Sequence, residues 1–229
     1  MWSERRSPKT RDGRLSTTSS SLRAEVQPRV FQTFERLCAA RGAGGAVLEI
    51  GAVPAPNTLL CLEAIRGATA KIGVNLSEPS HYADFDILQA NANAMSGFED
   101  GRFDTVLCNA VLEHDKFFWQ TLAEIRRVTK PGGLVVIGVP GYTGPPQRRS
   151  AVRPRTARAL ARLGLGRLNW LWWSTLTAGI HNAPGDFYRF SPQAVQAVFF
   201  QDMTDVEIVS VTIPPVIIGA GRTPGHRRA

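Results

Sequence analysis

The sequence EDGRFDTVLCNAVLEH at residues 99–114, together with KPGGLVVIGVP at residues 130–140, decides the fold class. Each stretch contains a short, mostly apolar segment, at residues 103–108 and 134–139, that follows a turn signal. Mostly apolar segments of this length are typical of strands buried on both faces of a sheet. Residues 116–129, between the two runs, have the apolar spacing of an amphipathic helix. Two parallel strands joined by a helical crossover are therefore expected.

The same alternation of strand and helix extends outward from this unit. It predicts an α/β fold with a doubly wound, mostly parallel sheet of seven strands and helices on both faces. A helical pattern begins at Ser21 and ends at Gly42, and because Pro28 lies inside it, either a kink or a fresh helix start is expected near Gln27. The other expected strands are residues 46–50, 71–75, 87–90, 205–213 and 216–219, the other expected helices are 57–66 and 191–200, and residues 79–86 are expected to form a loop or a short helix.

The charge pattern suggests how the chain is organised. Residues 1–20 are basic and Ser-rich and are expected to be a disordered tail, and residues 222–229 form a second basic tail. Residues 21–229 are expected to be one domain, in which residues 142–190 are a helical insertion after the fifth strand. This insertion carries seven arginines before residue 170. We expect it to be a lid or substrate wall, and residues 148–173 also have the composition of a segment that contacts a membrane surface.

Composition limits the class of protein. The chain has 229 residues, a net charge of +8 and 43% hydrophobic residues, which is enough for a packed core. No stretch has the roughly 18 apolar residues of a membrane-spanning helix, and the N-terminus has no apolar run of a secretory signal. Cys38, Cys61 and Cys108 lack metal-ligand spacing, so no metal is expected, and a reducing, cytoplasmic location is expected.

Ligands of open parallel sheets bind at the carboxyl ends of the strands, where the strand order reverses. In this sequence, those positions hold Glu49 to Ala55, Asn75, Asn91 to Ala94 and Asn109 to His114. The expected site is therefore built from loops that are far apart in the sequence.

Five segments in order give the chain a family resemblance: VLEIG (47–51), GVN (73–75), EDGRFD (99–104), VLCNAVLEH (106–114) and KPGGLVVIGVP (130–140). They resemble the class I S-adenosylmethionine-dependent methyltransferases, of the methyltransferase type 11 group. The resemblance covers about residues 44–141. It implies the sheet order 3-2-1-4-5-7-6, S-adenosylmethionine as cofactor, and methyl transfer to a small-molecule or glycan- or lipid-linked acceptor, whose reacting atom is O, N or C.

The resemblance also implies which residues contact the cofactor. Glu49, Gly51 and Ala52 match the family's acidic strand end and glycine-rich turn, although Ala52 to Pro56 replace its further glycines. Asn75 stands where the family has an acid for the ribose hydroxyls, and Asn91 with Ala92 stands near the adenine position, with Asn93 and Ala94 as the alternative register. Asn109, Glu113 and His114 are expected beside the sulfonium.

The acceptor side is less strongly marked in the sequence. His114, His181 and Tyr188 are the candidate catalytic bases. Asp186 and Arg189 belong to a stretch that resembles the segment covering the active site in some family members. They are candidate substrate-binding residues, which suits an anionic acceptor. Each also has a structural interpretation, as a loop residue or a helix cap.

Three other hypotheses about the function can be compared with the sequence. The amides and the missing glycines also fit a methyltransferase fold that acts only as a binding or regulatory protein. A nicotinamide-dependent dehydrogenase would need a G-x-G-x-x-G turn, and residues 51–56 read GAVPAP. A nucleic-acid methyltransferase is disfavoured because the basic charge lies outside the expected folded core and CNAVLEH has no Pro-Pro-Tyr pattern.

Overall fold

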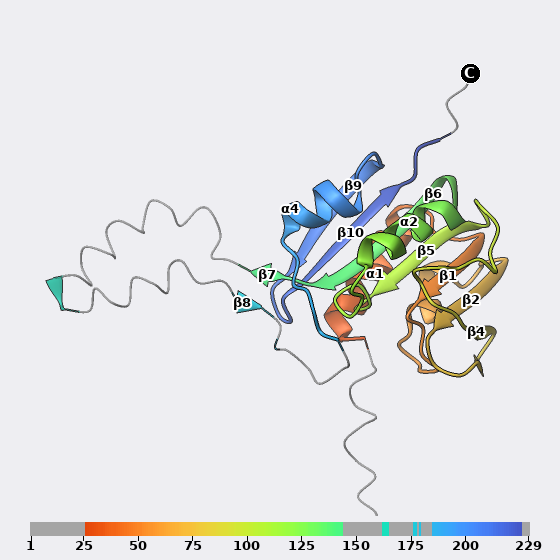
Figure 1. The fold of residues 1–229 in the computed structure, drawn as a ribbon, viewed down its shortest axis with the longest axis horizontal. Coiled ribbons are helices and arrows are strands. Elements are labelled where there is room, and N and C mark those ends of the chain that lie inside the picture. Colours follow the sequence, from red (N-terminus) through yellow and green to blue (C-terminus); the bar gives the residue numbers. More distant parts are fainter. Residues whose placement is uncertain (1–25, 144–161, 165–175, 178, 180–184, 226–229) are drawn as a thin grey trace, which may run out of the picture.

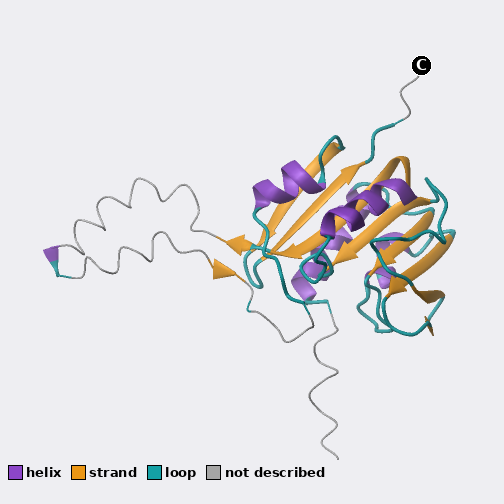
Figure 2. Ribbon diagram, viewed as in Figure 1, coloured by secondary structure: helices purple, strands orange, loops and turns teal. Residues whose placement is uncertain are grey.

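The computed structural model describes residues 26–143, 162–164, 176–177, 179 and 185–225. Within these residues the chain forms a twisted mixed sheet with helices against both faces (Figures 1 and 2). The sheet has eight strands in the order β3-β4-β2-β1-β5-β6-β10-β9.

Five neighbouring strands are parallel and form the central part of the sheet: β4 (Phe85–Gln89), β2 (Ala70–Asn75), β1 (Ala46–Ile50), β5 (Phe103–Asn109) and β6 (Thr129–Pro140). The antiparallel hairpin of β9 (Thr204–Val211) and β10 (Val216–Arg222) closes one side of the sheet through β6. Each parallel strand therefore ends at the same edge of the sheet.

The expectation of seven strands was one too few. The additional strand, β3 (Ser80–Tyr82), pairs antiparallel with β4 at the edge of the sheet, within the segment expected to be a loop or short helix. A chain of only nine residues between β2 and β4 has no room for a crossover helix, and it forms this short hairpin instead.

The helices lie largely where they were predicted, with one exception. Helix α1 (Pro28–Ala40) begins at Pro28, which is one of the two alternatives that the sequence left open. Helix α2 (Phe118–Val128) fills the predicted 116–129 segment. The predicted helix at 57–66 was wrong, because that segment holds only two short 3-10 turns, Leu59–Cys61 and Glu63–Ile65.

The last helical segment begins with α4 (Pro192–Ala194) and continues as a π-helical turn, Val195–Phe199. The hydroxyl oxygen of Ser191 accepts a 3.0 Å hydrogen bond from the backbone N–H of Ala194, as expected for an N-cap.

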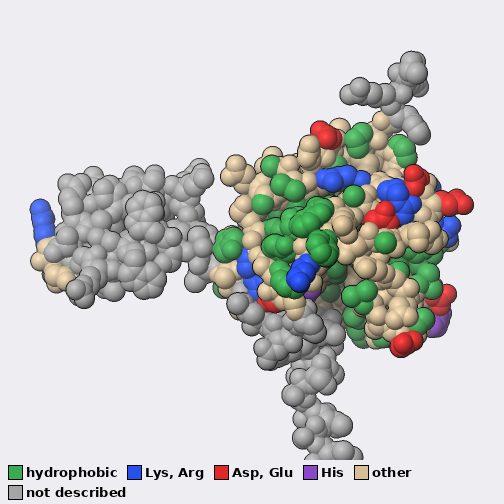
Figure 3. All heavy atoms as spheres, viewed as in Figure 1, with side chains coloured by type: hydrophobic (Ala, Val, Ile, Leu, Met, Phe, Trp, Pro, Cys, Tyr) green, Lys and Arg blue, Asp and Glu red, His purple; other side chains and the backbone are tan. Residues whose placement is uncertain are grey.

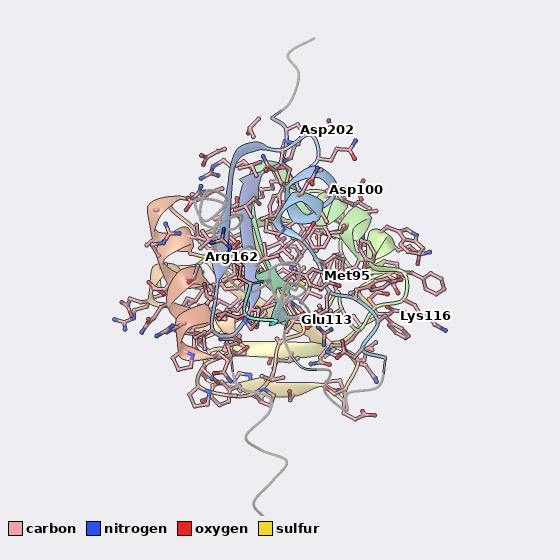
Figure 4. The ribbon with its side chains drawn as sticks, turned by 90° about the vertical axis from the view of Figure 1, so that its left-hand side faces the viewer. Met95, Asp100, Glu113, Lys116, Arg162 and Asp202 are labelled. Atoms are coloured by element: carbon pink, nitrogen blue, oxygen red, sulfur yellow. The ribbon has the colours of Figure 1, made fainter. Side chains whose placement is uncertain are left out.

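Two hydrophobic clusters lie on opposite faces of the sheet. Helix α1 packs Val30, Phe34 and Leu37 on one face, with the 3-10 turns beside it. Helix α2 and the α4 segment cover the other face, where Ile125 and Phe199 are buried. Figure 4 shows the two sets of helices on either side of the strands. Both clusters anchor the strands whose ends form the site.

The expected lid falls mostly outside the described residues. Within it the structure describes β7 (Tyr142–Thr143), which follows β6 and pairs antiparallel with β8 (Leu176–Thr177), and residues 162–164, 179 and 185–190. The tail at 1–20 also lies outside the described residues. The C-terminal tail begins later than predicted, because Arg222 belongs to β10 and donates a 2.9 Å hydrogen bond to the carbonyl oxygen of Gly132. In the described part of the chain no helix is long and apolar enough to cross a bilayer, and no three His, Cys, Asp or Glu side chains gather as a metal site.

Candidate functional site

A cavity of about 500 Å³ lies at the carboxyl ends of β1, β2, β4 and β5. This position is the one that an open parallel sheet uses for ligands, and the volume falls in the usual range for a small-molecule site. Its walls are Ile50, Gly51, Val74, Asn75, Leu76, Ala90, Asn91, Ala92, Asn93, Ala110, Val111, His114, Asp115, Lys116, Phe117, Thr121 and Phe187.

Gly51 forms the turn at the end of β1. Its φ of +83° lies in the left-handed region that glycine adopts at little cost. A Cβ at this position would also lie 2.3 Å from Cγ2 of Val111. The backbone of this turn can therefore approach both Val111 and the cavity only because residue 51 has no side chain.

Glu49 orders the chain that follows this turn. Its carboxylate accepts a hydrogen bond of 2.7 Å from the hydroxyl of Thr58 and bonds of 3.1 and 2.9 Å from the backbone N–H groups of Leu59 and Leu60. The side chain is buried, and this burial raises the pKa of Glu49 to about 7. Glu49 thus acts on the cavity through the loop and does not line it.

Asn75 connects the ends of β1 and β2. Its side-chain N–H donates a 2.7 Å hydrogen bond to the carbonyl oxygen of Ala52, and its side-chain oxygen accepts one of 2.7 Å from the N–H of Leu76. The side chain of Ala52 points to β2, where a Cβ on Gly73 would meet it at 2.5 Å. Asn75 therefore lines the cavity, whereas Ala52 contributes its backbone to the turn beside it.

Four consecutive residues after β4 line the cavity: Ala90, Asn91, Ala92 and Asn93. The side-chain oxygen of Asn91 accepts a 3.0 Å hydrogen bond from the N–H of Asn93. Ala94, part of the alternative register, does not line the cavity.

A polar network that the sequence did not reveal forms one wall. The side-chain N–H₂ of Asn93 donates to Asp115 Oδ2 at 2.7 Å and to Thr121 Oγ1 at 2.9 Å, and the Thr121 hydroxyl donates to the same Asp115 oxygen at 2.7 Å. Asp115 Oδ1 accepts from the N–H of Phe117 at 2.8 Å. The three residues are 22 and 6 positions apart, so no local spacing signalled their contact.

Glu113 and His114 follow β5. Glu113 is 1% exposed, its Oε2 has no hydrogen-bond partner within the described residues, and burial raises its pKa to about 7. His114 lines the cavity, with its Nε2 3.8 Å from Glu113 Oε1. Asn109 does not line the cavity; its side-chain oxygen lies against Gly138, where a Cβ would approach to 2.5 Å. Figure 4 shows Glu113 inside the molecule and below the helices.

Residues 185–190 cross over Glu113. The N–H groups of Phe187 and Tyr188 donate to the carbonyl oxygen of Glu113 at 2.7 and 3.3 Å. Asp186 and Arg189, the expected substrate-binding pair, form a partly buried ion pair with each other through both terminal guanidinium nitrogens. Arg189 nearby opposes the upward shift of the Glu113 pKa that burial causes, and Asp186 adds to that shift.

The candidate base Tyr188 does not line the cavity. The hydroxyl of Tyr188 donates a 3.0 Å hydrogen bond to the carbonyl oxygen of Lys116, and its ring packs at 5.1 Å from that of Phe118. His181 lies outside the described residues. Of the candidate bases that the structure describes, His114 is the one in the cavity wall.

Part of the chain matches a known protein family. The family described as "Methyltransferase domain" matches residues 37–137, from α1 to β6. No curated protein matches the sequence.

Several solved structures have the same fold. One is a 1,6-didemethyltoxoflavin-N1-methyltransferase of Burkholderia thailandensis with S-adenosylhomocysteine, at 18% identity and a TM-score of 0.54, over 85% of this chain and 78% of that chain. Another is the N-methyltransferase NodS of Bradyrhizobium japonicum with S-adenosylhomocysteine, at 15% identity and a TM-score of 0.55, over 91% and 94% of the two chains. A third is phosphoethanolamine N-methyltransferase 2 of Haemonchus contortus with S-adenosylmethionine, at 13% identity and a TM-score of 0.56, over 88% and 54%. At these identities the likeness is one of fold.

Proposed function

We propose that the cavity binds S-adenosylmethionine and that the protein transfers a methyl group to a small-molecule acceptor, because a methyltransferase-domain family model matches residues 37–137. The observation that carries this proposal is the cavity itself, which joins the Gly51 turn to the ends of β2, β4 and β5. The three solved structures named above have this fold and contain S-adenosylmethionine or S-adenosylhomocysteine.

The residues present fit such a cofactor. The Gly51 turn has no side chain on the cavity side, so the backbone comes close to a bound ligand. Asn75, Asn91 and Asn93 supply amide oxygens and N–H groups at the same wall, and Leu76 and Ala92 supply apolar surface. Such a mixture of apolar walls and few polar groups is usual for small-molecule sites.

The cofactor supplies a methyl group bound to a positively charged sulfur. The acceptor's lone pair would form a bond to the methyl carbon while the carbon–sulfur bond breaks, and the sulfur would keep the electron pair. We propose that the imidazole of His114 takes the acceptor's proton, since it borders the cavity. Glu113 would stabilise the imidazolium that forms, because its carboxylate lies 3.8 Å away.

Positioning is the larger contribution that the chain would make. Holding donor and acceptor in line supplies about 7–11 kcal/mol of the barrier in favourable cases. Glu49 would hold the loop beside the donor, and residues 185–190 would exclude water above Glu113. An acceptor with an ionisable O–H or N–H fits this arrangement; glycan- and lipid-linked acceptors with such a group belong to the same proposal.

The test is a transfer assay with S-adenosylmethionine labelled on its methyl group. The purified chain is incubated with pooled O–H and N–H acceptors, and S-adenosylhomocysteine formation is measured for the wild type and for His114→Asn. Acceptor-dependent turnover that His114→Asn lowers by about 10²-fold or more supports the proposal. If His114→Asn has the same turnover as the wild type, His114 is not the base. If the wild type shows no turnover with any acceptor pool, a binding or regulatory role is favoured.

A further inference from the structure

Three exposed aromatic side chains lie together at the mouth of the cavity. Phe117, Trp119 and Phe187 are 49%, 52% and 47% exposed, and Phe117 and Phe187 line the cavity. The rings of Phe117 and Trp119 meet edge to face at 5.7 Å. We call these three side chains the aromatic rim. Exposed aromatic surface that continues into a cavity is typical of a ligand site.

One cation accompanies the aromatic rim. Lys116 lines the same cavity, and its ammonium nitrogen lies 5.7 Å from the centre of the Phe187 ring. Figure 4 shows Lys116 at the outer side of the molecule, away from the strands, and Figure 3 shows hydrophobic side chains gathered around a cationic one on the face that carries α2.

The charge of Lys116 is not neutralised by an acid in the described part of the chain. The adjacent Asp115 points inward, where the side chains of Asn93 and Thr121 and the N–H of Phe117 donate to it. The other cation near the site, Arg189, is held by Asp186. Among the described residues, Lys116 is therefore the cation that faces an incoming molecule at this mouth.

We infer that the acceptor is a small molecule with an aromatic body and one anionic group, such as a carboxylate. Its ring would contact the aromatic rim and its anionic group would pair with Lys116. This inference rests on the proposed function and specifies the substrate class of the same site. A charge-assisted contact beside apolar surface is strengthened by the removal of water.

The test uses three probes of one shape: 2-naphthoate, 2-naphthamide and 2-naphthylmethylammonium, which are anionic, neutral and cationic. Their binding is measured by calorimetry to the full chain saturated with S-adenosylhomocysteine. We expect 2-naphthoate to bind about tenfold more tightly than the cationic probe. Lys116→Glu should reverse this order, and Lys116→Met should remove the preference while the apolar stem remains.

Arg102 provides a matched control. Its guanidinium carbon lies 5.6 Å from the centre of the Phe103 ring, which is the same kind of contact at a place outside the cavity wall. Arg102→Met removes one positive charge and should leave all three affinities unchanged. A loss of preference in this control as large as in Lys116→Met would show that only net charge matters and would overturn the inference.

The outcomes separate this inference from the proposed function. If S-adenosylhomocysteine binds but the three probes bind equally in the wild type and in Lys116→Glu, the acceptor class is wrong and the methyltransferase proposal stands. If S-adenosylhomocysteine does not bind, the proposed function fails first. If the wild type binds vesicles of anionic lipid but not 2-naphthoate, and Lys116→Glu abolishes the vesicle binding, Lys116 contacts a membrane surface and the inference is overturned. Lys116→Met covers the case in which Lys116→Glu does not fold.

Discussion

The side-chain N–H of Asn75 donates a 2.7 Å hydrogen bond to the carbonyl oxygen of Ala52, which fixes the turn after β1 against the end of β2. The side-chain oxygen of Asn75 is engaged by the N–H of Leu76, so the orientation of the amide is determined. An amide can make both contacts, whereas a carboxylate can make only the second.

Asn75→Asp is therefore expected to weaken cofactor binding, although it introduces the acid that the family resemblance implies at this position. The new carboxylate oxygen would face the Ala52 carbonyl oxygen at about the same distance and would push the turn away. We expect the affinity for S-adenosylhomocysteine, measured by calorimetry, to fall about tenfold.

Asn91→Asp is the control for this experiment. Asn91 also lines the cavity, but its side chain only accepts a hydrogen bond, from the N–H of Asn93, and a carboxylate keeps that contact. This variant should weaken binding less than Asn75→Asp, because the turn after β1 keeps its contact with Asn75. Tighter binding by Asn75→Asp would mean that the contact with Ala52 does not govern the turn.

Gly51→Ala should destabilise the protein. The added methyl group would sit at a φ of +83° and would lie 2.3 Å from Val111. The two effects together should lower the free energy of unfolding by about 2–4 kcal/mol. Gly67→Ala, where a Cβ meets nothing within 4 Å, is the comparison and should change it by less than about 1 kcal/mol. Equal effects in urea unfolding would show that the Gly51 turn tolerates a side chain.

Glu113 should make stability depend on pH. Burial raises its pKa from near 4.5 to about 7, so between these values the folded protein binds a proton that the unfolded chain has released. The free energy of unfolding therefore falls as the pH rises through this window and levels off above about pH 7. Glu49, whose pKa burial also raises to about 7, lowers the free energy of unfolding over the same pH range.

Glu113→Gln removes the contribution of Glu113. The difference in unfolding free energy between about pH 5 and pH 8 should shrink by about 1–3 kcal/mol, measured by urea titration at both values. The slope that remains in this variant is assigned to Glu49 and to other groups. A pH dependence identical to that of the wild type would show that Glu113 does not titrate in this range.

Tyr188→Phe tests the assignment of a structural role to this hydroxyl. Loss of its hydrogen bond to the Lys116 carbonyl oxygen should cost about 0.5–1.5 kcal/mol of stability. The affinity for S-adenosylhomocysteine should not change, because Tyr188 does not line the cavity. A large loss of affinity with unchanged stability would return Tyr188 to the site.

Much of the fold followed from the sequence because its strands are short, apolar and bounded by turn signals. The runs at 103–108 and 134–139 became the buried centres of β5 and β6, and Pro28 marked the start of α1. The predicted helix at 57–66 was wrong because Leu59 and Leu60 give their backbone N–H groups to Glu49, a contact across the fold that competes with helical bonding. Strand β3 was missed because three residues show no periodicity.

The site could be predicted only where it lies at strand ends. Gly51, Asn75, Asn91, Ala92 and His114 were expected and line the cavity. Lys116, Phe117 and Phe187 were not, because an exposed Lys and Phe next to a helix start carry no signal of a ligand. Asp186 and Arg189 were expected to bind the substrate, but they form an ion pair with each other, which the sequence did not indicate.

The central claim is that the cavity binds S-adenosylmethionine, and calorimetric titration of the purified chain with S-adenosylhomocysteine tests it most directly. We predict one site per chain, with micromolar or tighter affinity that Gly51→Ala reduces at least tenfold and Gly67→Ala leaves unchanged. No heat of binding up to millimolar concentration would contradict the claim, and the fold would then serve a binding or regulatory role without methyl transfer.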